Sequence, residues 1–297
     1  MTALSDTTVQ APPRTLSERL VRFIGKTPVH IILGLIALVW LVPSIGLLIT
    51  SFRPSSDMRA TGWWTVPFDP NFTLVNYERV IGAEDMGAAF LNSLWITIPS
   101  TILPLLIASM AAFALAWVRF PFRDTIFLII VALLMVPVQI GFIPIVVAMR
   151  ESGLPLLTTY GGVWLVHTAF ALPFGIFLLR NFFITLPKDL IEAARIDGAS
   201  NVAIFRTIVL PLSVPAIAAY GIFQFLWVWN DLLMALVYAQ RNAIQPMTVK
   251  VTTLLGTYAT EWSLLAAAAF LIMIVPLVVF ISLQRYFVQG LLAGSVK

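Results

Sequence analysis

The chain alternates between long apolar segments and shorter polar connections. Six apolar segments are long enough to cross the ~30 Å hydrocarbon core of a bilayer, which takes about 20 helical residues. We place these segments at residues 29–51, 88–118, 125–149, 159–184, 206–237 and 262–286. The pattern predicts an all-α, polytopic membrane protein with six transmembrane helices.

Composition supports one membrane domain. Hydrophobic residues make up 60% of the 297 residues and charged residues 11%, against roughly 25% charged residues in an ordinary soluble domain. We expect a transmembrane domain over residues 29–287, between an N-terminal segment of residues 1–28 and a C-terminal tail of residues 288–297. The first apolar segment is too long for the core of a cleaved signal peptide, and no Ala-x-Ala site follows it. It should therefore remain as the first span.

The basic residues predict an orientation. Twelve of the 18 Lys and Arg residues lie in or beside the N-terminal segment, the second and fourth connections and the C-terminal end, and the other six lie with the remaining connections. The positive-inside rule places the richer set in the cytoplasm, with both termini and the connection at residues 185–205. No Lys/Arg cluster accompanies the net charge of +4, so the expected partner is the lipid bilayer and not nucleic acid.

Proline is frequent within the predicted spans. In a membrane bundle, the carbonyl groups that a proline frees can be satisfied by neighbouring helices or by a water-filled cavity. Kinked helices around a path suit a transporter, although membrane helices tolerate proline in general. The prolines concerned are Pro43, Pro99, Pro104, Pro137, Pro144, Pro173, Pro211, Pro215 and Pro276.

Catalytic and metal sites are not expected. The chain has no cysteine, and its two histidines, His30 and His167, lie in different apolar segments. Gly25-Lys26-Thr27 has the ending of a phosphate-binding Walker loop, but Leu20 occupies the position where that loop requires glycine. We therefore predict no enzyme activity, no metal and no cofactor bound by this chain.

The connection at residues 185–205 should contain a short helix. Pro187 suits a first helical turn, Asp189 places negative charge at the N-terminal end of the helix dipole, and Gly198 suits a C-terminal cap. Small and apolar side chains on this helix need a surface to bury against. From the residues alone, that surface is either a partner protein or the lipid headgroups.

The same connection carries a run of residues with fixed gaps. Glu192-Ala193-Ala194 is followed by three residues, Gly198, nine residues and Ile208-Val209-Leu210-Pro211. This run resembles the EAA loop of ABC importer permeases, whose coupling helix seats in a cleft of the ATPase subunit. The resemblance implies that ATP and Mg bind the partner ATPase. The coupling residues it implies are Glu192, Ala193, Ala194, Asp197, Gly198, Leu210 and Pro211.

A second group of polar residues lies near the end of the fifth predicted span. At ~100° per residue, Gln224, Trp227 and Asp231 share one helical face, with Asn230 at its margin. An amide, an indole and a carboxylate on one face can bind a sugar. Alternatively, a straight helix from residue 206 would put Asp231 about 37 Å along its axis, near the outer surface, where Trp commonly anchors a helix. Both interpretations remain open.

Further segments resemble the carbohydrate branch of these importers, in particular the smaller maltose-type permease subunit. They are Trp229-Asn230-Asp231, the tail at residues 284–297 and Thr61-Gly62-Trp63-Trp64-Thr65, which is similar to permeases for alpha-glucosides. The resemblance implies a bacterial inner-membrane permease that imports a sugar or oligosaccharide by alternating access. Its implied partners are a second permease subunit, two ATPase subunits and an extracytoplasmic solute-binding protein.

Two alternatives compete with sugar import by an ABC complex. An ABC permease for another solute, such as a polyamine or a phosphonate, would keep the loop at residues 185–205 without needing the polar residues of the fifth span. A proton-coupled secondary transporter would use Asp231 as its proton site, because a carboxylate within a span is a functional candidate, and would need no ATPase.

Overall fold

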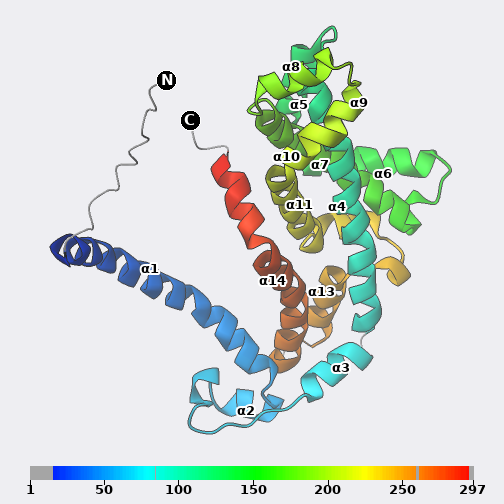
Figure 1. Cartoon of the computed structure of the whole chain (residues 1–297). Coiled ribbons are helices and arrows are strands. Elements are labelled where there is room, and N and C mark those ends of the chain that lie inside the picture. Colours follow the sequence, from blue (N-terminus) through cyan, green and yellow to red (C-terminus); the bar gives the residue numbers. More distant parts are fainter. Residues whose placement is uncertain (1–15, 84, 259–260, 294–297) are drawn as a thin grey trace.

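The computed structural model describes residues 16–83, 85–258 and 261–293, which are helical with short connections and contain no β-strand (Figure 1). The first residues of the predicted N-terminal segment, 1–15, and the end of the predicted tail, 294–297, lie outside the described residues. The α-helices are α1 (Leu16–Ser51), α2 (Ser55–Ala60), α3 (Val75–Ala83), α4 (Met86–Trp117), α5 (Arg123–Leu133), α6 (Phe142–Glu151), α7 (Tyr160–Phe183), α8 (Lys188–Ile196), α9 (Asn201–Ile204), α10 (Leu210–Leu212), α11 (Val214–Trp229), α12 (Leu233–Tyr238), α13 (Met247–Thr257) and α14 (Trp262–Ala293). The short 3₁₀ helices are η1 (Trp63–Thr65), η2 (Val138–Gly141), η3 (Leu156–Thr158) and η5 (Asn242–Ile244), and η4 (Phe205–Val209) is a short π-helix.

Four of the six predicted spans are continuous helices. Stretches of α1, α4, α7 and α14 are long and apolar enough to cross a membrane. The other two predicted spans are bent pairs, and the number of candidate spans among the described residues is four, or six if each bent pair is one span. The all-helical membrane fold predicted from the apolar segments is confirmed.

The third predicted span, residues 125–149, is interrupted near its middle. α5 ends at Leu133, the chain bends by 95°, and a second helical stretch runs from Val138 to Glu151. Pro137 stands directly before this second stretch with extended backbone, at φ −59° and ψ 126°. Because proline has no N–H to donate, it cannot continue the hydrogen bonds of α5. The span therefore opens into two short helices.

The fifth predicted span, residues 206–237, is interrupted twice. Residues Asn201–Leu212 and Val214–Trp229 meet at a 77° bend beside Ser213, and Pro215 follows in the first turn of α11. At its other end α11 stops at Trp229. The Nδ2 group of Asn230 donates to Leu226 O at 2.8 Å, so that a carbonyl group of the last helical turn is hydrogen-bonded by a side chain.

The core of the bundle is formed by α4, α7, α11 and α14. α4 packs most extensively against α7, and α11 lies against both α4 and α14. α1 leans away from this core in Figure 1, and only 6% of its apolar window is buried. Figure 1 places α5, α8, α9 and the C-terminal end of α14 toward one end of the bundle and α2 and α3 at the other. A coupling loop and an outer surface would lie at opposite ends of such a molecule.

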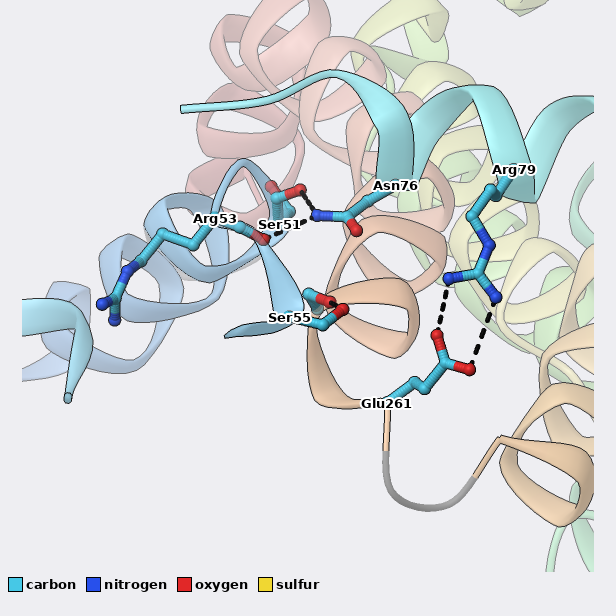
Figure 2. Close-up of polar contacts among 7 residues, drawn as sticks. Ser51, Arg53, Ser55, Asn76, Arg79 and Glu261 are labelled. Carbon is cyan, nitrogen blue, oxygen red and sulfur yellow. Dashed lines mark hydrogen bonds and ion pairs between the residues drawn. The ribbon is translucent and has the colours of Figure 1, made fainter. Parts of the chain in front are cut away.

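A network of polar contacts joins α1, α3 and α14 at the end of the bundle that carries α2 (Figure 2). The buried Asn76 amide donates to the carbonyl groups of Ser51 and Arg53, at 2.9 Å each. Arg79 Nη1, on α3, lies 2.6 Å from Oε2 of Glu261, the residue directly before α14. Hydrogen bonding to the Arg79 guanidinium holds the pKa of the Glu261 carboxyl below its usual value. These contacts attach the leaning α1 to the core.

Candidate functional site

The helix predicted in the 185–205 connection is α8, and its ends are set by local sequence. Pro187 directly precedes it with extended backbone. At the other end Gly198 has φ +80°, its N–H donates to Arg195 O at 3.1 Å, and the next N–H, of Ala199, donates to Ala194 O at 2.9 Å. Glycine adopts this left-handed conformation without the penalty that other residues incur. The predicted cap at Gly198 is confirmed.

The two faces of α8 have different surroundings. Ile191 is fully buried, and Ala194 packs against the same hydrophobic cluster, which also contains Phe183 and Ile204. Glu192 and Ala193 are exposed on the opposite side. Arg195 donates from Nη2 to Trp117 O, at the end of α4. The helix is therefore fixed to the bundle on one side and open on the other.

Apolar side chains extend the open face of α8. Ile196 is 86% exposed and Leu190 47% exposed, and Val202 continues the surface onto α9 with 65% exposure. Asp197 and Gly198 are exposed at the end of the helix. This exposed surface combines small, acidic and apolar groups.

Leu210 and Pro211, the last two predicted coupling residues, lie apart from α8. They belong to α10, directly after the short π-helix η4 and directly before the bend at Ser213. Pro211 is exposed and Leu210 is partly buried. Their place in the fold is the junction between the α8–α9 connection and α11.

A pocket of about 300 Å³ lies where the interrupted third and fifth spans meet. This volume is at the lower end of the range for small-molecule sites, about 300 to 1,000 Å³. Both chain breaks contribute: Val138 and Gln139 follow the break after α5, and Asn230 and Asp231 follow the end of α11. The complete lining is Val138, Gln139, Phe142, Trp227, Asn230, Asp231, Leu233 and Met234.

Three of the four residues predicted for the solute path line this pocket. Trp227 has 59% of its surface exposed and Asn230 is exposed, whereas the Asp231 side chain is 14% exposed. Asp231 Oδ2 accepts a hydrogen bond from the Ala235 N–H at 3.2 Å, in the first turn of α12, and lies 3.9 Å from His167 Nε2. The carboxylate therefore faces the protein and stabilises the start of α12.

Gln224, the fourth predicted residue, lies elsewhere. It is 6% exposed, and its Nε2 donates to Ser100 O at 3.1 Å, which joins α11 to α4. The single helical face expected for Gln224, Trp227 and Asp231 does not form, because α11 ends at Trp229. Gln224 is a packing contact between helices and not part of the pocket lining.

Comparison with known proteins identifies the family. A profile of the family described as the binding-protein-dependent transport system inner membrane component matches residues 105–292. The osmoprotective compounds uptake permease protein GgtD of Synechocystis sp. is 52% identical over 286 residues, which cover 95% of each chain. The alpha-glucoside transport system permease protein AglG of Rhizobium meliloti is 47% identical over 257 residues, 83% of this chain and 68% of that one.

A solved structure shows the same fold. One chain of a bacterial ABC transporter involved in the import of the acidic polysaccharide alginate superposes with a TM-score of 0.73 and 22% sequence identity, covering 93% of this chain and 100% of that one. In this family the permease works with ATPase subunits, which bind the nucleotide, and with a periplasmic binding protein. The chain belongs to the inner-membrane permeases of binding-protein-dependent ABC transport systems.

Proposed function

We propose that this permease is one half of the pore of an ATP-driven importer for neutral sugars, with alpha-glucosides as the solute class. It pairs with a second permease subunit and two ATPase subunits, and a solute-binding protein delivers the sugar from outside. Both termini and the 185–205 connection face the cytoplasm, since the connections and ends at that side carry twelve of the 18 basic residues.

The exposed face of α8 is the observation that supports coupling to an ATPase subunit. Glu192 and Ala193 are exposed while Ile191 and Ala194 hold the helix to the bundle. An exposed surface with these small and apolar side chains fits a cleft in a partner protein, because the small side chain of Ala193 permits close backbone approach. The partner in this position is the ATPase subunit. Glu192 adds a carboxylate that can pair with a basic residue of the cleft.

The solute class rests on the pocket and on the relatives. AglG is an alpha-glucoside permease by its name, and MelC of Bacillus subtilis, 31% identical over 285 residues, is a permease for melibiose, raffinose and stachyose. The pocket offers an indole, two amides and apolar side chains, and the one carboxylate in its lining is held by α12. Amides bind hydroxyl groups and an indole can stack on a sugar ring. This chemistry favours a neutral polyhydroxylated solute over a polyamine or a phosphonate.

A continuous stretch of chain could transmit a movement of α8, caused by ATP binding to the ATPase subunits, to the pocket. The α8–α9 connection leads through η4 and α10 into the bend at Ser213, and α11 then runs to the pocket at Asn230. Closure of the ATPase subunits would displace α8 and, through this continuous chain, tilt α11. Alternating access then follows from movement of the pocket lining between two orientations.

Reconstitution tests the proposed function. Calorimetry on the binding protein first shows which of sucrose, maltose and trehalose it binds. The complex of both permeases and the ATPase, placed in liposomes with that binding protein on the outer side, is then expected to take up the labelled sugar. Uptake should require ATP on the cytoplasmic side. Uptake without ATP, or retention of none of the three sugars, would contradict the proposal.

Asp231 distinguishes ATP-driven import from proton coupling. Replacement by asparagine keeps an oxygen that can accept the Ala235 N–H, and we expect Asp231→Asn to retain most of the uptake. Asp231→Ala leaves that N–H unpaired, so we expect a lower unfolding temperature and a several-fold lower rate of uptake. A proton carrier would instead lose all transport in Asp231→Asn, because the amide cannot titrate. Uptake measured with and without a protonophore separates the two outcomes.

A further inference from the structure

We infer that Gln139 is a solute-contacting residue, whose amide forms with Asn230 and Trp227 the hydrogen-bonding set that selects an uncharged polyhydroxylated solute. This inference rests on the proposed function and adds to it a residue from a different span. Gln139 is 91 positions from Asn230 in the sequence, and only the bend between α5 and α6 brings both into one lining.

The break in the third span leaves the Gln139 side chain available. Gln139 is exposed in η2, the turn that follows Pro137. Its amide makes no hydrogen bond to another described residue. The neighbouring side chains of the lining, Val138 and Phe142, are apolar. An unpaired amide beside apolar surface is costly within a membrane, unless water or a solute binds it.

The other polar groups of the pocket complete the set. Asn230 uses its Nδ2 in the hydrogen bond to Leu226 O, which leaves its Oδ1 as an acceptor. The Trp227 indole N–H, like the Gln139 amide, has no partner among the described residues. Gln139 supplies both a donor and an acceptor. The pocket therefore presents donors and acceptors that match hydroxyl groups, each of which is both donor and acceptor.

The charges around the pocket agree with an uncharged solute. Asp231 is the one ionisable residue in the lining, and its Oδ2 accepts the Ala235 N–H with His167 behind it. No Lys or Arg lines the pocket, so a carboxylate or phosphate group would enter without a counter-charge. Solute recognition consequently depends on hydrogen bonds to neutral groups. Among the polar side chains of the lining, Gln139 offers the most donor and acceptor groups without a partner among the described residues.

The test compares Gln139→Leu with Ile140→Ala in the reconstituted complex. Ile140 is the next residue of η2, is 65% exposed and does not line the pocket, so its truncation controls for disturbance of the turn. With the labelled disaccharide chosen above, Gln139→Leu should reduce the sugar imported per ATP hydrolysed by about fivefold, the effect of one lost hydrogen bond. Ile140→Ala should match the wild type.

Two readouts separate a solute contact from a structural role. Stimulation of the ATPase by the loaded binding protein should stay unchanged in Gln139→Leu, and the unfolding temperature should stay within the range of Ile140→Ala. A wild-type ratio of sugar to ATP in Gln139→Leu would overturn the inference while leaving the proposed function intact. A loss of ATPase stimulation or an equal loss in Ile140→Ala would also overturn it, because η2 would then act through conformation. Absence of ATP-driven uptake in the wild type would instead overturn the proposed function.

Discussion

Glu192→Lys and Ala193→Trp are expected to abolish the stimulation of ATP hydrolysis by loaded binding protein, with at least a tenfold loss of uptake, while the permease still folds. Both side chains are exposed on α8, and surface substitutions usually change the free energy of unfolding by less than about 0.5 kcal/mol. In the assembled complex the same positions face the proposed ATPase cleft. Lysine would reverse the charge there, and tryptophan would prevent the close approach that alanine permits.

Same-position variants provide the controls for α8. Ala193→Ser keeps the side chain small, and Glu192→Gln keeps its volume while removing the charge. We expect Ala193→Ser to retain full coupling and Glu192→Gln an intermediate level. Co-purification of the ATPase with each permease variant shows whether docking or the later conformational step is lost. Normal coupling in Ala193→Trp would exclude α8 as the docking element.

Gly162→Ala should destabilise the permease strongly although it adds one methyl group. A Cβ atom at Gly162, in the first turn of α7, would lie 1.9 Å from the backbone oxygen of Leu156 in η3. Neither backbone segment can move aside without shifting a helix, and overpacking of this kind costs about 1 to 3 kcal/mol or more. Because the contact is this short and its partner is backbone, the cost should lie toward the upper end of that range and exceed the gain in helix propensity from Gly to Ala, about 1 kcal/mol. The unfolding temperature of the purified permease should therefore fall by several degrees.

The adjacent glycine is a matched control for this prediction. At Gly161 a Cβ atom would meet only Thr159 Oγ1, at 3.9 Å. Gly161→Ala should gain helix propensity without a clash, and we expect an unchanged or slightly raised unfolding temperature. The two variants change the same residue type in the same helical turn. If both had the same unfolding temperature, the close contact between α7 and η3 would not exist.

The short helix α8 was predictable because its determinants are local. Pro187 and Gly198 lie within one turn of the ends of α8, and each acts through its own backbone conformation. Which side of the helix faces the bundle was not predictable from the run Glu192-Ala193-Ala194. The two alanines are equivalent in sequence, but Ala194 packs on the core cluster and Ala193 does not. That difference depends on residues from α7 and α9.

The bends in the third and fifth spans were not predictable from proline content. Pro99 and Pro104 lie inside the continuous α4, and Pro173 lies inside the continuous α7. Pro137 and Pro215 accompany bends of 95° and 77°. The residue type is the same, so the outcome depends on which neighbouring helices support the chain at that point. Helical periodicity therefore predicted one continuous face for Gln224, Trp227 and Asp231, whereas α11 ends at Trp229 and α12 begins at Leu233.

The residues that line the pocket could not be predicted from the sequence, because they are brought together by contacts between segments far apart in the chain. Gln224 looked like a solute ligand because its spacing to Trp227 and Asp231 fits a helix, but its partner Ser100 is 124 positions away. Gln139 gave no comparable signal, since it stands in an apolar segment with no polar neighbour at helical spacing. The proline two positions before it was the one available hint. Pairing these segments requires the fold.

The two interrupted spans have a consequence for hydration. The break after α5 and the end of α11 both interrupt regular helical hydrogen bonding beside the pocket, and backbone groups that lose a helical partner need other polar partners within a membrane. Water molecules can supply them between transport events, and sugar hydroxyls can replace that water with similar geometry. A sugar would then exchange its hydration shell for protein groups stepwise, so that its dehydration presents a low barrier to passage. The backbone groups at the helix breaks would thus replace the water that hydrates the sugar, and this replacement lowers the free-energy cost of moving the sugar through the membrane interior.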